Sequence, residues 1–486
     1  MNFQKIKIFA LIVAAILSLS FAVFAQTAAE KILVGIGEKT ITVEEFINRA
    51  ELTPRPSYAK GNSNAVKNIV LNSLIAEKLI ALDKENNTEL NNDRKYLNFI
   101  KGRKEQKMRE ILYRETAYDK ASVDSSEVIK ELEKNSVSYT IEYFTVPTEE
   151  TAKEIKQKIG LRGASFEKIY YEYTGDKNIP EKEITRNNIG IDELEKILYG
   201  ERKIRKYEIL GPIKVNDRFL FVKIINWKKE NTLSASEYAR RFNKTSGDLR
   251  KAEADKIYAA FIKKTMKGKK IEFNDKIFFK LAEILAPFYV GGDKGGGWKN
   301  FSDEAETANP SGLPEPENIK GETFYTIDGE KITVEDFLNE IEKHPLVFRK
   351  SGFAEKEFPA LFRLSVADMV RDKFLTDIAY ERKLDQRSEV KRETEMWKDA
   401  VISLYESGKF SSGSNSSQIS SALSAYIVEL NKKYKNRIKP DYNEFEKIRL
   451  TDVDLFAVEK GAPFPAVVPP FPKLTKKQNI DDYKTK

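Results

Sequence analysis

Hydrophobic residues recur at helical spacing along much of the chain. Across 64–85 (NAVKNIVLNSLIAEKLIALDKE) they stand three and four positions apart on more than one side, which predicts a long, buried helix. Residues 93–135 and 236–265 have charged patterns that also predict helix. Apolar and polar residues alternate instead in 138–146 (SYTIEYFTV) and 216–224 (NDRFLFVKI), which predicts strands of a small α+β domain. We therefore expect an α+β protein that is mainly helical.

One of the predicted helix starts occurs twice, at a constant offset of 291 residues. TITVEEFINRAELTP (Thr40–Pro54) matches KITVEDFLNEIEKHP (Lys331–Pro345). Thr42 and Thr333 stand at the expected N-caps, and an acid follows three residues later in each copy, as a capping box requires. The matching cap signals predict two copies of one local structure.

Two further matches extend the internal repeat. LIAEKLI (Leu74–Ile80) matches MVRDKFL (Met369–Leu375), and KKIEFNDKIFFKL matches NRIKPDYNEFEKI near Ile438 more loosely. A core unit is therefore expected twice, and residues 137–229 are extra sequence between the halves of the first copy. The expected parts are a signal peptide (1–25), an N-terminal helical segment (26–136), the inserted domain (137–229), a helical segment completing the first core (230–290), a Gly/Pro-rich linker (291–319), the second core repeat (320–457) and a Pro-rich tail (458–486).

The N-terminus has the pattern of a secretory signal. Lys5 and Lys7 precede the apolar run Ile8–Ala25, and Val23-Phe24-Ala25 resembles a cleavage site. An uncleaved membrane anchor is the alternative, although 18 apolar residues are short for a membrane span. No later segment is apolar for that long. We expect an exported protein with no stable membrane span after the signal is removed.

Composition excludes several kinds of chemistry. The chain has no cysteine, so thiol nucleophiles, disulfides and cysteine-based zinc sites are impossible. Its single histidine, His344, precedes a proline at an expected helix end, where it suits the helix dipole better than a catalytic role. The acids form no calcium-loop pattern and GGDKGGG lacks the ending of a phosphate loop, so no metal or cofactor is expected. The +8 net charge comes from 83 bases mixed with 75 acids, which favours solvated helix faces over nucleic-acid binding.

The order of these pieces resembles the SurA-type parvulin chaperones of the bacterial periplasm. VGIGEKTITVEEFINRAELTPRP (Val34–Pro56) is similar to the opening of that family's core, and LNSLIAEKLIALDKE to its long second helix. The insert resembles a parvulin domain over its whole length, in EYFTVPTEETAKEIKQKI, GASFEKIYYEYTGD, NNIG, DELEKILY and YEILGPIKVNDRFLFVKI. The resemblance implies a SurA-like helical chaperone core that occurs twice, with one parvulin-like α+β domain inserted in the first copy.

The insert departs from the family where the family has its two histidines. Glu142 and Leu220 fall at those positions, whereas Asp176 matches the acid that usually follows the loop. Rotation about an X–Pro bond must cross a barrier of roughly 18–20 kcal/mol but needs no covalent step, so the losses predict weak or absent catalysis. Glu142 and Asp176 would form a like-charge pair if they were close; alternatively, Glu142 points to solvent and Asp176 caps a turn.

Candidate substrate-binding residues of the insert are the aromatic side chains Tyr143, Phe144, Phe219 and Phe221, although alternation along the strands places half of the insert's aromatics in the core. The leading functional hypothesis is a periplasmic, ATP-independent chaperone that assists the folding of outer-membrane or secreted proteins. An active peptidyl-prolyl cis-trans isomerase and a structural periplasmic scaffold are the alternatives. GAPFPAVVPPFPKL (Gly461–Leu474) favours polyproline II and is expected either to be disordered or to dock as an extended arm.

Overall fold

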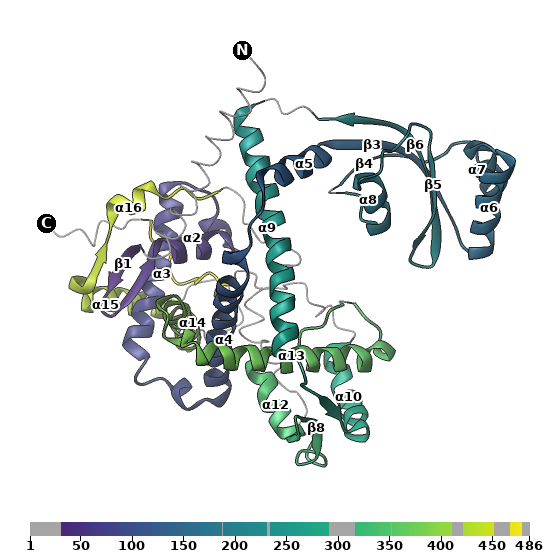
Figure 1. Cartoon of the computed structure of the whole chain (residues 1–486). Helices are drawn as coiled ribbons and strands as arrows, with labels where there is room; N and C mark the ends of the chain where they lie inside the picture. Colours follow the sequence, from purple (N-terminus) through teal and green to yellow (C-terminus); the bar gives the residue numbers. More distant parts are fainter. Residues whose placement is uncertain are drawn as a thin grey trace. The chain divides into compact units, whose positions relative to one another are not determined.

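The structure is a computed structural model that describes residues 31–186, 188–230, 234–290, 316–350, 352–410, 421–451 and 467–478. The expected signal peptide and most of the expected linker lie outside these residues. The protein is α+β and mainly helical, with three small antiparallel sheets (Figure 1). In the part described, no helix is long and apolar enough to cross a membrane.

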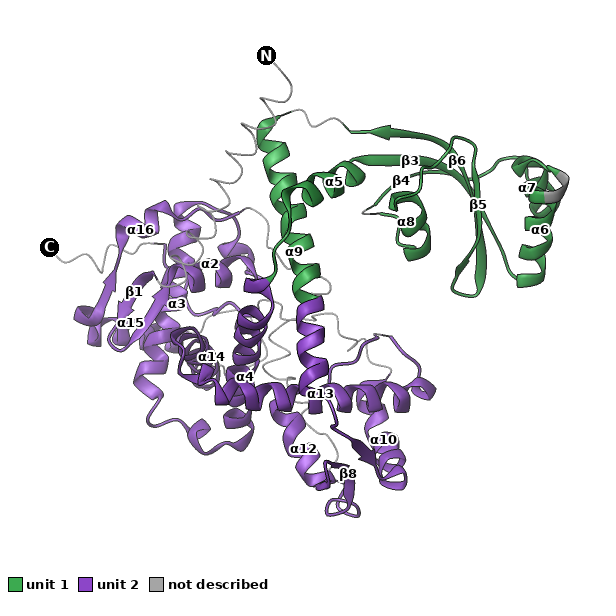
Figure 2. Ribbon diagram, in the orientation of Figure 1, with its two compact units in different colours: residues 1–18, 121–255 green, residues 19–120, 256–486 purple. Residues whose placement is uncertain are grey.

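The chain divides into two compact units (Figure 2). Unit 1 comprises the described residues of 121–255, and unit 2 comprises those of 31–120 and 256–478. The segment 137–229, expected to be an inserted domain, lies wholly within unit 1.

Unit 1 is built on a four-stranded sheet with the order β4-β3-β6-β5. Its elements are α5 (Ser125–Asn135), β3 (Val137–Val146), α6 (Glu149–Arg162), α7 (Phe166–Thr174), β4 (Glu181–Thr185), α8 (Asp192–Tyr199), β5 (Ile209–Val215), β6 (Arg218–Lys229) and the first part of α9 (Ala235–Thr265). Helix α8 covers one sheet face through Leu194 and Leu198, while α6 and α7 cover the other through Ile155 and Phe166. Alternating strand residues therefore feed two separate apolar clusters.

Unit 2 contains the two copies of the repeat. Its elements are β1 (Ile32–Ile36), β2 (Lys39–Thr42), α2 (Val43–Glu51), α3 (Asn64–Lys84), α4 (Arg94–Thr116), β7 (Ile271–Phe273), α10 (Asp275–Tyr289), β8 (Thr323–Ile327), β9 (Glu330–Thr333), α12 (Val334–Lys343), α13 (Phe358–Glu381), α14 (Ser388–Gly408), α15 (Ser421–Lys433), β10 (Ile438–Pro440) and α16 (Tyr442–Lys447). Helix α3 is buried along most of its length, and α14 packs against both α3 and α4. The broad apolar pattern of 64–85 reflects this burial on several sides.

Each copy is a β-hairpin followed by a short and a long helix, and each is completed by a third strand. In copy 1, β10 pairs with β1, and α16 places Phe445 in the same core. In copy 2, β7 pairs with β8, and α10 places Phe278 in that core. The expectation that 230–290 completes the first copy is therefore wrong, because its strand and helix complete the second copy and the end of the chain completes the first.

The two copies agree residue by residue in their backbone bonds. Ile438 lies opposite Ile36 in copy 1 as Ile271 lies opposite Ile327 in copy 2. The amide of the next helix cap bonds to the hairpin at the same place, Asp441 to Leu33 (2.8 Å) and Asn274 to Phe324 (3.0 Å). The register shift in the hairpin also recurs, between Ile32 and Val34 and between Thr323 and Tyr325. The weak sequence match of the closing segments therefore identifies structural equivalents, although it assigns them to the wrong copies.

The matching N-caps behave alike, but the acids after them do not. Thr42 and Thr333 both accept a hydrogen bond from the third helical amide. The Asp336 side chain accepts a hydrogen bond from the backbone amide of Thr333, which completes a capping box. The carboxylate of Glu45, at the equivalent position, instead pairs with Lys78 of α3 at 2.9 Å. Copy 1 therefore uses this acid in its interior.

Candidate functional site

The expected catalytic face of unit 1 carries a lysine between two carboxylates. Glu142 on β3 lies opposite Lys223 on β6, with Lys223 Nζ 3.2 Å from Glu142 Oε2. The same ammonium pairs with Glu167 of α7. Burial lowers the pKa of Lys223, but its bonds to Glu167 and Glu142 outweigh this and hold the pKa above its usual range. Glu142 therefore faces a cation.

Leu220 lies on the opposite face of the sheet from Glu142. Its side chain is buried in the cluster under α8, together with Val222 and Ile224. Phe221, one residue later, belongs to the cluster under α6 and α7, on the Glu142 side. Because side chains alternate along a strand, a one-residue shift of an alignment moves a position to the other face. The structure thus does not bring Glu142 and Leu220 together.

Asp176 lies in the exposed turn after α7. Its Oδ1 accepts a hydrogen bond from the amide of Asn178 at 2.9 Å, and its own amide donates to Thr174 Oγ1 at 3.1 Å. A carboxylate that bonds to an amide two residues later closes an Asx turn. The position of Asp176 is therefore accounted for by local turn formation.

The four aromatic candidates do not form one surface. Phe144 and Phe221 are buried in the core, where their rings stack with centroids 5.4 Å apart. Tyr143 is half-buried and packs at the α8 side, whereas Phe219 is half-buried and packs at the α6–α7 side. Only the two half-buried rings are accessible to a ligand, and they lie on opposite faces of the sheet.

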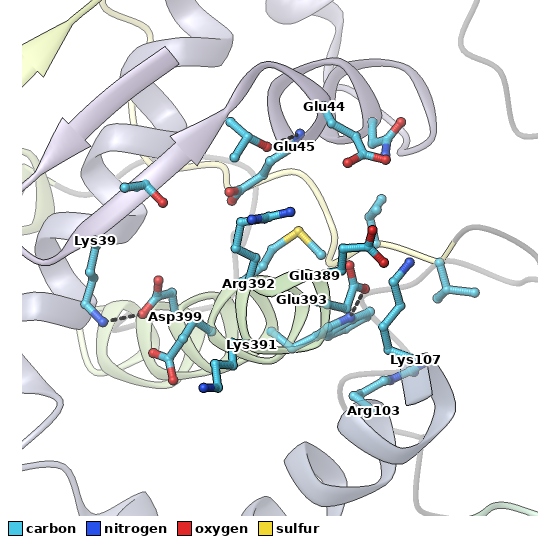
Figure 3. Close-up of a pocket in the computed structure, with 18 of the residues that line it drawn as sticks. Lys39, Glu44, Glu45, Arg103, Lys107, Glu389, Lys391, Arg392, Glu393 and Asp399 are labelled. Carbon is cyan, nitrogen blue, oxygen red and sulfur yellow. Dashed lines mark hydrogen bonds and ion pairs between the residues drawn. The ribbon is translucent and has the colours of Figure 1, made fainter. Parts of the chain in front are cut away.

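A charged cavity of about 440 Å³ lies in unit 2, between α2, α4 and α14 (Figure 3). Its acids include Glu44, Glu389 and Glu393, and its bases include Arg103 and Lys107. Acids and bases line the wall in nearly equal numbers, so the cavity does not select an ion of one sign. In the described part of the chain, no group of three or more acidic or histidine side chains is arranged to hold a metal ion.

Glu393 is an acid of this cavity whose pKa is raised. Burial raises its pKa to about 7, against the opposing effects of Lys107 and of the Trp397 indole N–H, which donates to Glu393 Oε1 at 3.0 Å. The Arg103 guanidinium lies over the Trp397 ring, 4.3 Å from a ring centroid. Perturbed acids are common at functional sites. Burial also raises the pKa of Glu45 in the same cavity, but Glu45 is paired with Lys78, so we assign the cavity no reaction.

A buried ionic network forms part of the cavity wall and continues beside it. The Asp399 carboxylate pairs with the ammonium groups of Lys39 (2.7 Å) and Lys78 (3.1 Å), and all three side chains are at most 7% exposed. Next to it, Arg49 and Glu77 form a two-bond pair at 2.9 and 2.7 Å. Each of these charges is therefore paired inside the protein, which matters because an unpaired buried charge is strongly destabilising. The network fixes α2, α3 and α14 relative to one another.

His344 also has a structural setting. It caps the C-terminus of α12, as the sequence indicates, and its Nε2 lies 2.8 Å from Glu105 Oε2 on α4. Glu105 accepts a second bond from the Tyr380 hydroxyl at 3.0 Å. The single histidine of the chain therefore joins copy 2 to α4.

The described part of the Pro-rich tail binds across copy 1 as an extended segment. We call residues 467–478 (VVPPFPKLTKKQ) the arm. Val468 packs with Met396 and Trp397, and Phe471 and Leu474 belong to the copy 1 core. The expectation that the tail docks as an extended arm is met for these residues.

Side chains of copy 1 bind the backbone of the arm. Arg49 Nη2 donates to the carbonyl of Pro470 at 2.8 Å. Three residues of α3 donate to later carbonyls: Ser73 to Thr475 (3.4 Å), Asn72 to Lys477 (2.9 Å) and Asn68 to Gln478 (2.8 Å). We call Arg49, Asn68, Asn72 and Ser73 with the apolar residues around them the arm site. Sequence reasoning missed it, although polar residues within the apolar helix pattern of 64–85 were a visible signal.

Comparisons with protein-family models, with curated proteins and with solved structures give no match. The case for a function therefore rests on the residues and their geometry.

Proposed function

We propose that this chain is an exported, periplasmic, ATP-independent chaperone that binds unfolded outer-membrane or secreted proteins through its helical unit. On this proposal, the SurA-like core occurs twice and the parvulin-like domain has lost most of its catalysis. The observation that carries the proposal is the arm site, where a polypeptide without regular secondary structure is held by its backbone carbonyls.

Carbonyl recognition suits a protein that must bind many sequences. Every residue of an unfolded chain has a carbonyl, so donors such as Asn68 and Asn72 do not demand a particular side chain. Each such bond contributes only about 0.5–1.5 kcal/mol net, which permits release without an energy source. Apolar contacts next to these donors, as at Val468 and Phe471, add affinity for chains that have not yet buried their own apolar residues.

The alternative of an active prolyl isomerase has less support. The two strand positions expected to carry the catalytic groups lie on opposite faces, and Glu142 is paired with Lys223. The scaffold alternative requires no binding of other polypeptides, so it differs from the chaperone proposal in a direct assay.

The test is dilution of a urea-unfolded β-barrel membrane protein into buffer with the full mature chain and no nucleotide. At one chain per β-barrel protein, we expect light scattering to fall to a small fraction of its value without the chain. Unchanged scattering at a tenfold excess would overturn the chaperone proposal and favour the scaffold. In parallel, NMR exchange on a short X–Pro peptide should stay at the uncatalysed rate. A strong acceleration that disappears in Lys223→Ala would make the protein an isomerase.

A further inference from the structure

The arm is an extended, proline-rich segment with buried apolar side chains. Val468, Phe471 and Leu474 are spaced three residues apart and are each at most 7% exposed, and Pro469 is buried as well. Polyproline II has three residues per turn, so its geometry would place Val468 and Phe471 on one side. The amide of Leu474 donates to the carbonyl of Pro472 at 3.0 Å, so the backbone turns at Lys473 before Leu474. Three prolines, at 469, 470 and 472, lie between these apolar residues and fix the φ angles that polyproline II requires.

The donors of the arm site follow the arm in order. The carbonyls of 475, 477 and 478 bond to Ser73, Asn72 and Asn68, so the arm runs antiparallel to α3. Arg49 reaches the carbonyl of Pro470 near the other end, and its guanidinium is itself fully buried and oriented by Glu77. The carbonyls bound by α3 follow the prolines, so a row of donors from one helix holds the last residues of the arm.

The arm site extends beyond the arm at both ends. Val467 and Val468 form part of the wall of the charged cavity. At the other end, Leu474, Thr475 and Lys477 line a second cavity of about 390 Å³ with α15. Cavities therefore adjoin the arm at both of its ends.

We propose that the arm site is a binding site for proline-rich segments of other polypeptides, with apolar residues at every third position, and that the arm is its intramolecular competitor. The proposal rests on the proposed function and deepens it by naming the class of segment that this site selects. Recognition of a preformed polyproline II segment loses little conformational entropy on binding. Proline-poor unfolded segments would bind this site more weakly.

The tether makes the arm a strong competitor. A segment attached by a short linker has an effective concentration on the order of millimolar. A free segment of equal intrinsic affinity must approach that concentration to displace the arm. Weakening the arm, while the donors stay intact, should therefore make binding of a free segment at least tenfold tighter.

The experiment uses the full mature chain and a fluorescein-labelled peptide VVPPFPKLTKKQ, followed by fluorescence anisotropy. Leu474→Ala weakens the arm by removing one buried anchor, and we expect it to bind the peptide at least tenfold more tightly than wild type. Lys473→Ala, at an exposed arm position, should bind it as wild type does. A peptide with the same composition in scrambled order should bind at least tenfold more weakly.

A circular-dichroism melt establishes that Leu474→Ala is folded. If it is not, hydrogen exchange on the wild-type chain replaces it: millimolar peptide should speed exchange in 467–478, and unchanged exchange would overturn the proposal. Equal binding of the scrambled peptide, or no binding to the folded variant, would also overturn it. Aggregation suppression without peptide binding refutes this inference alone, whereas peptide binding without suppression refutes the chaperone proposal alone.

Discussion

The two copies of the repeat in unit 2 share a backbone but differ in what they bury. Both have the same hairpin register, the same threonine caps and the same third-strand pairing. Copy 1 has a buried arginine–glutamate pair, Arg49 with Glu77. Copy 2 has Glu340 at the position of Arg49, and its interior is a cluster of stacked phenylalanines around Phe324 and Phe362. The conserved elements of the repeat are therefore those that define the backbone, and the side chains inside are free to diverge.

The difference extends to the arm site. The long-helix match pairs Leu74 with Met369, an offset of 295 residues, so Asn68, Asn72 and Ser73 correspond to Arg363, Ala367 and Asp368. Arg363 pairs with Asp275 and Asp368 pairs with Arg349. The copy 2 helix thus has other partners at two of the donor positions and an alanine at the third. Binding of an extended chain belongs to copy 1, which indicates specialisation of one copy rather than a symmetric pair of binding surfaces.

The largest expected effect is on the ionic interior of copy 1. Glu77→Ala leaves the Arg49 guanidinium buried without its carboxylate, which typically costs about 3–5 kcal/mol. Glu340→Ala removes the residue at Arg49's position in copy 2, where the side chain is 25% exposed and pairs with Lys343; exposed pairs contribute about 0–1 kcal/mol. Urea unfolding followed by circular dichroism compares the two. Equal losses would mean that the two interiors do not differ in the way described.

How much of this architecture is accessible from the sequence differs between elements. Threonine caps and hairpin residues are local signals, so the repeat at offset 291 predicts both copies. The exchange of the closing strands is not local: Ile438 and Ile271 have similar flanking residues, and only the folded chain shows which hairpin each one pairs with. Chain order misled the assignment because neighbouring elements usually pack together.

The candidate sites follow the same division. The apolar and proline pattern of the arm predicts an extended segment. The side chains that donate to its carbonyls lie about 400 positions earlier in the chain, and sequence pattern alone does not connect two segments so far apart. Within unit 1, alternation predicts that some aromatic side chains are buried, as Phe144 and Phe221 are. It does not establish the face of Leu220, because that depends on a strand register that an alignment without the structure leaves open to a one-residue shift.

An intermediate effect is expected at the contact between copy 2 and α4. Burial raises the pKa of Glu105, but the bond and charge of His344, together with the Tyr380 hydroxyl, hold that pKa below its ordinary value. A carboxyl whose pKa is lowered by folding stabilises the protein above its unfolded pKa, and this contribution is lost as the pH falls through the folded value. Glu105→Gln should therefore cost about 1.5–3 kcal/mol near pH 7, as expected for bonds to a charged group, and less below about pH 4.5.

Urea unfolding between pH 3 and 7 measures this dependence. Tyr380→Phe removes one of the two donors to Glu105 and should give a smaller loss than Glu105→Gln. Thr53, at the position of His344 in copy 1, instead donates to the carbonyl of Arg49 in its own helix end at 2.7 Å. A difference between wild type and Glu105→Gln that stays constant over the whole pH range would contradict the assignment.

The smallest effect is expected at the cavity beside copy 1. The pKa of Glu393 is raised to about 7 by burial, with Glu110 and Glu45 adding repulsion and Lys107 and Trp397 opposing it. A carboxyl whose pKa is raised by folding keeps its proton in the folded state between about pH 4.5 and 7, where the unfolded state has lost it, so stability falls as the pH rises through this range.

Glu393→Gln retains an acceptor for the Trp397 indole but has no charge to desolvate. It should be more stable than wild type at pH 8 by about 1–2 kcal/mol, which is less than the full shift would supply at about 1.4 kcal/mol per unit because the cavity admits water. Glu395→Gln, whose side chain is 53% exposed, should leave the pH dependence unchanged. Identical slopes of stability against pH in wild type and Glu393→Gln would show that the cavity does not desolvate this acid. The contrast between an ionic copy 1 and an aromatic copy 2 would then rest on the buried Arg49–Glu77 pair and the Asp399 network alone.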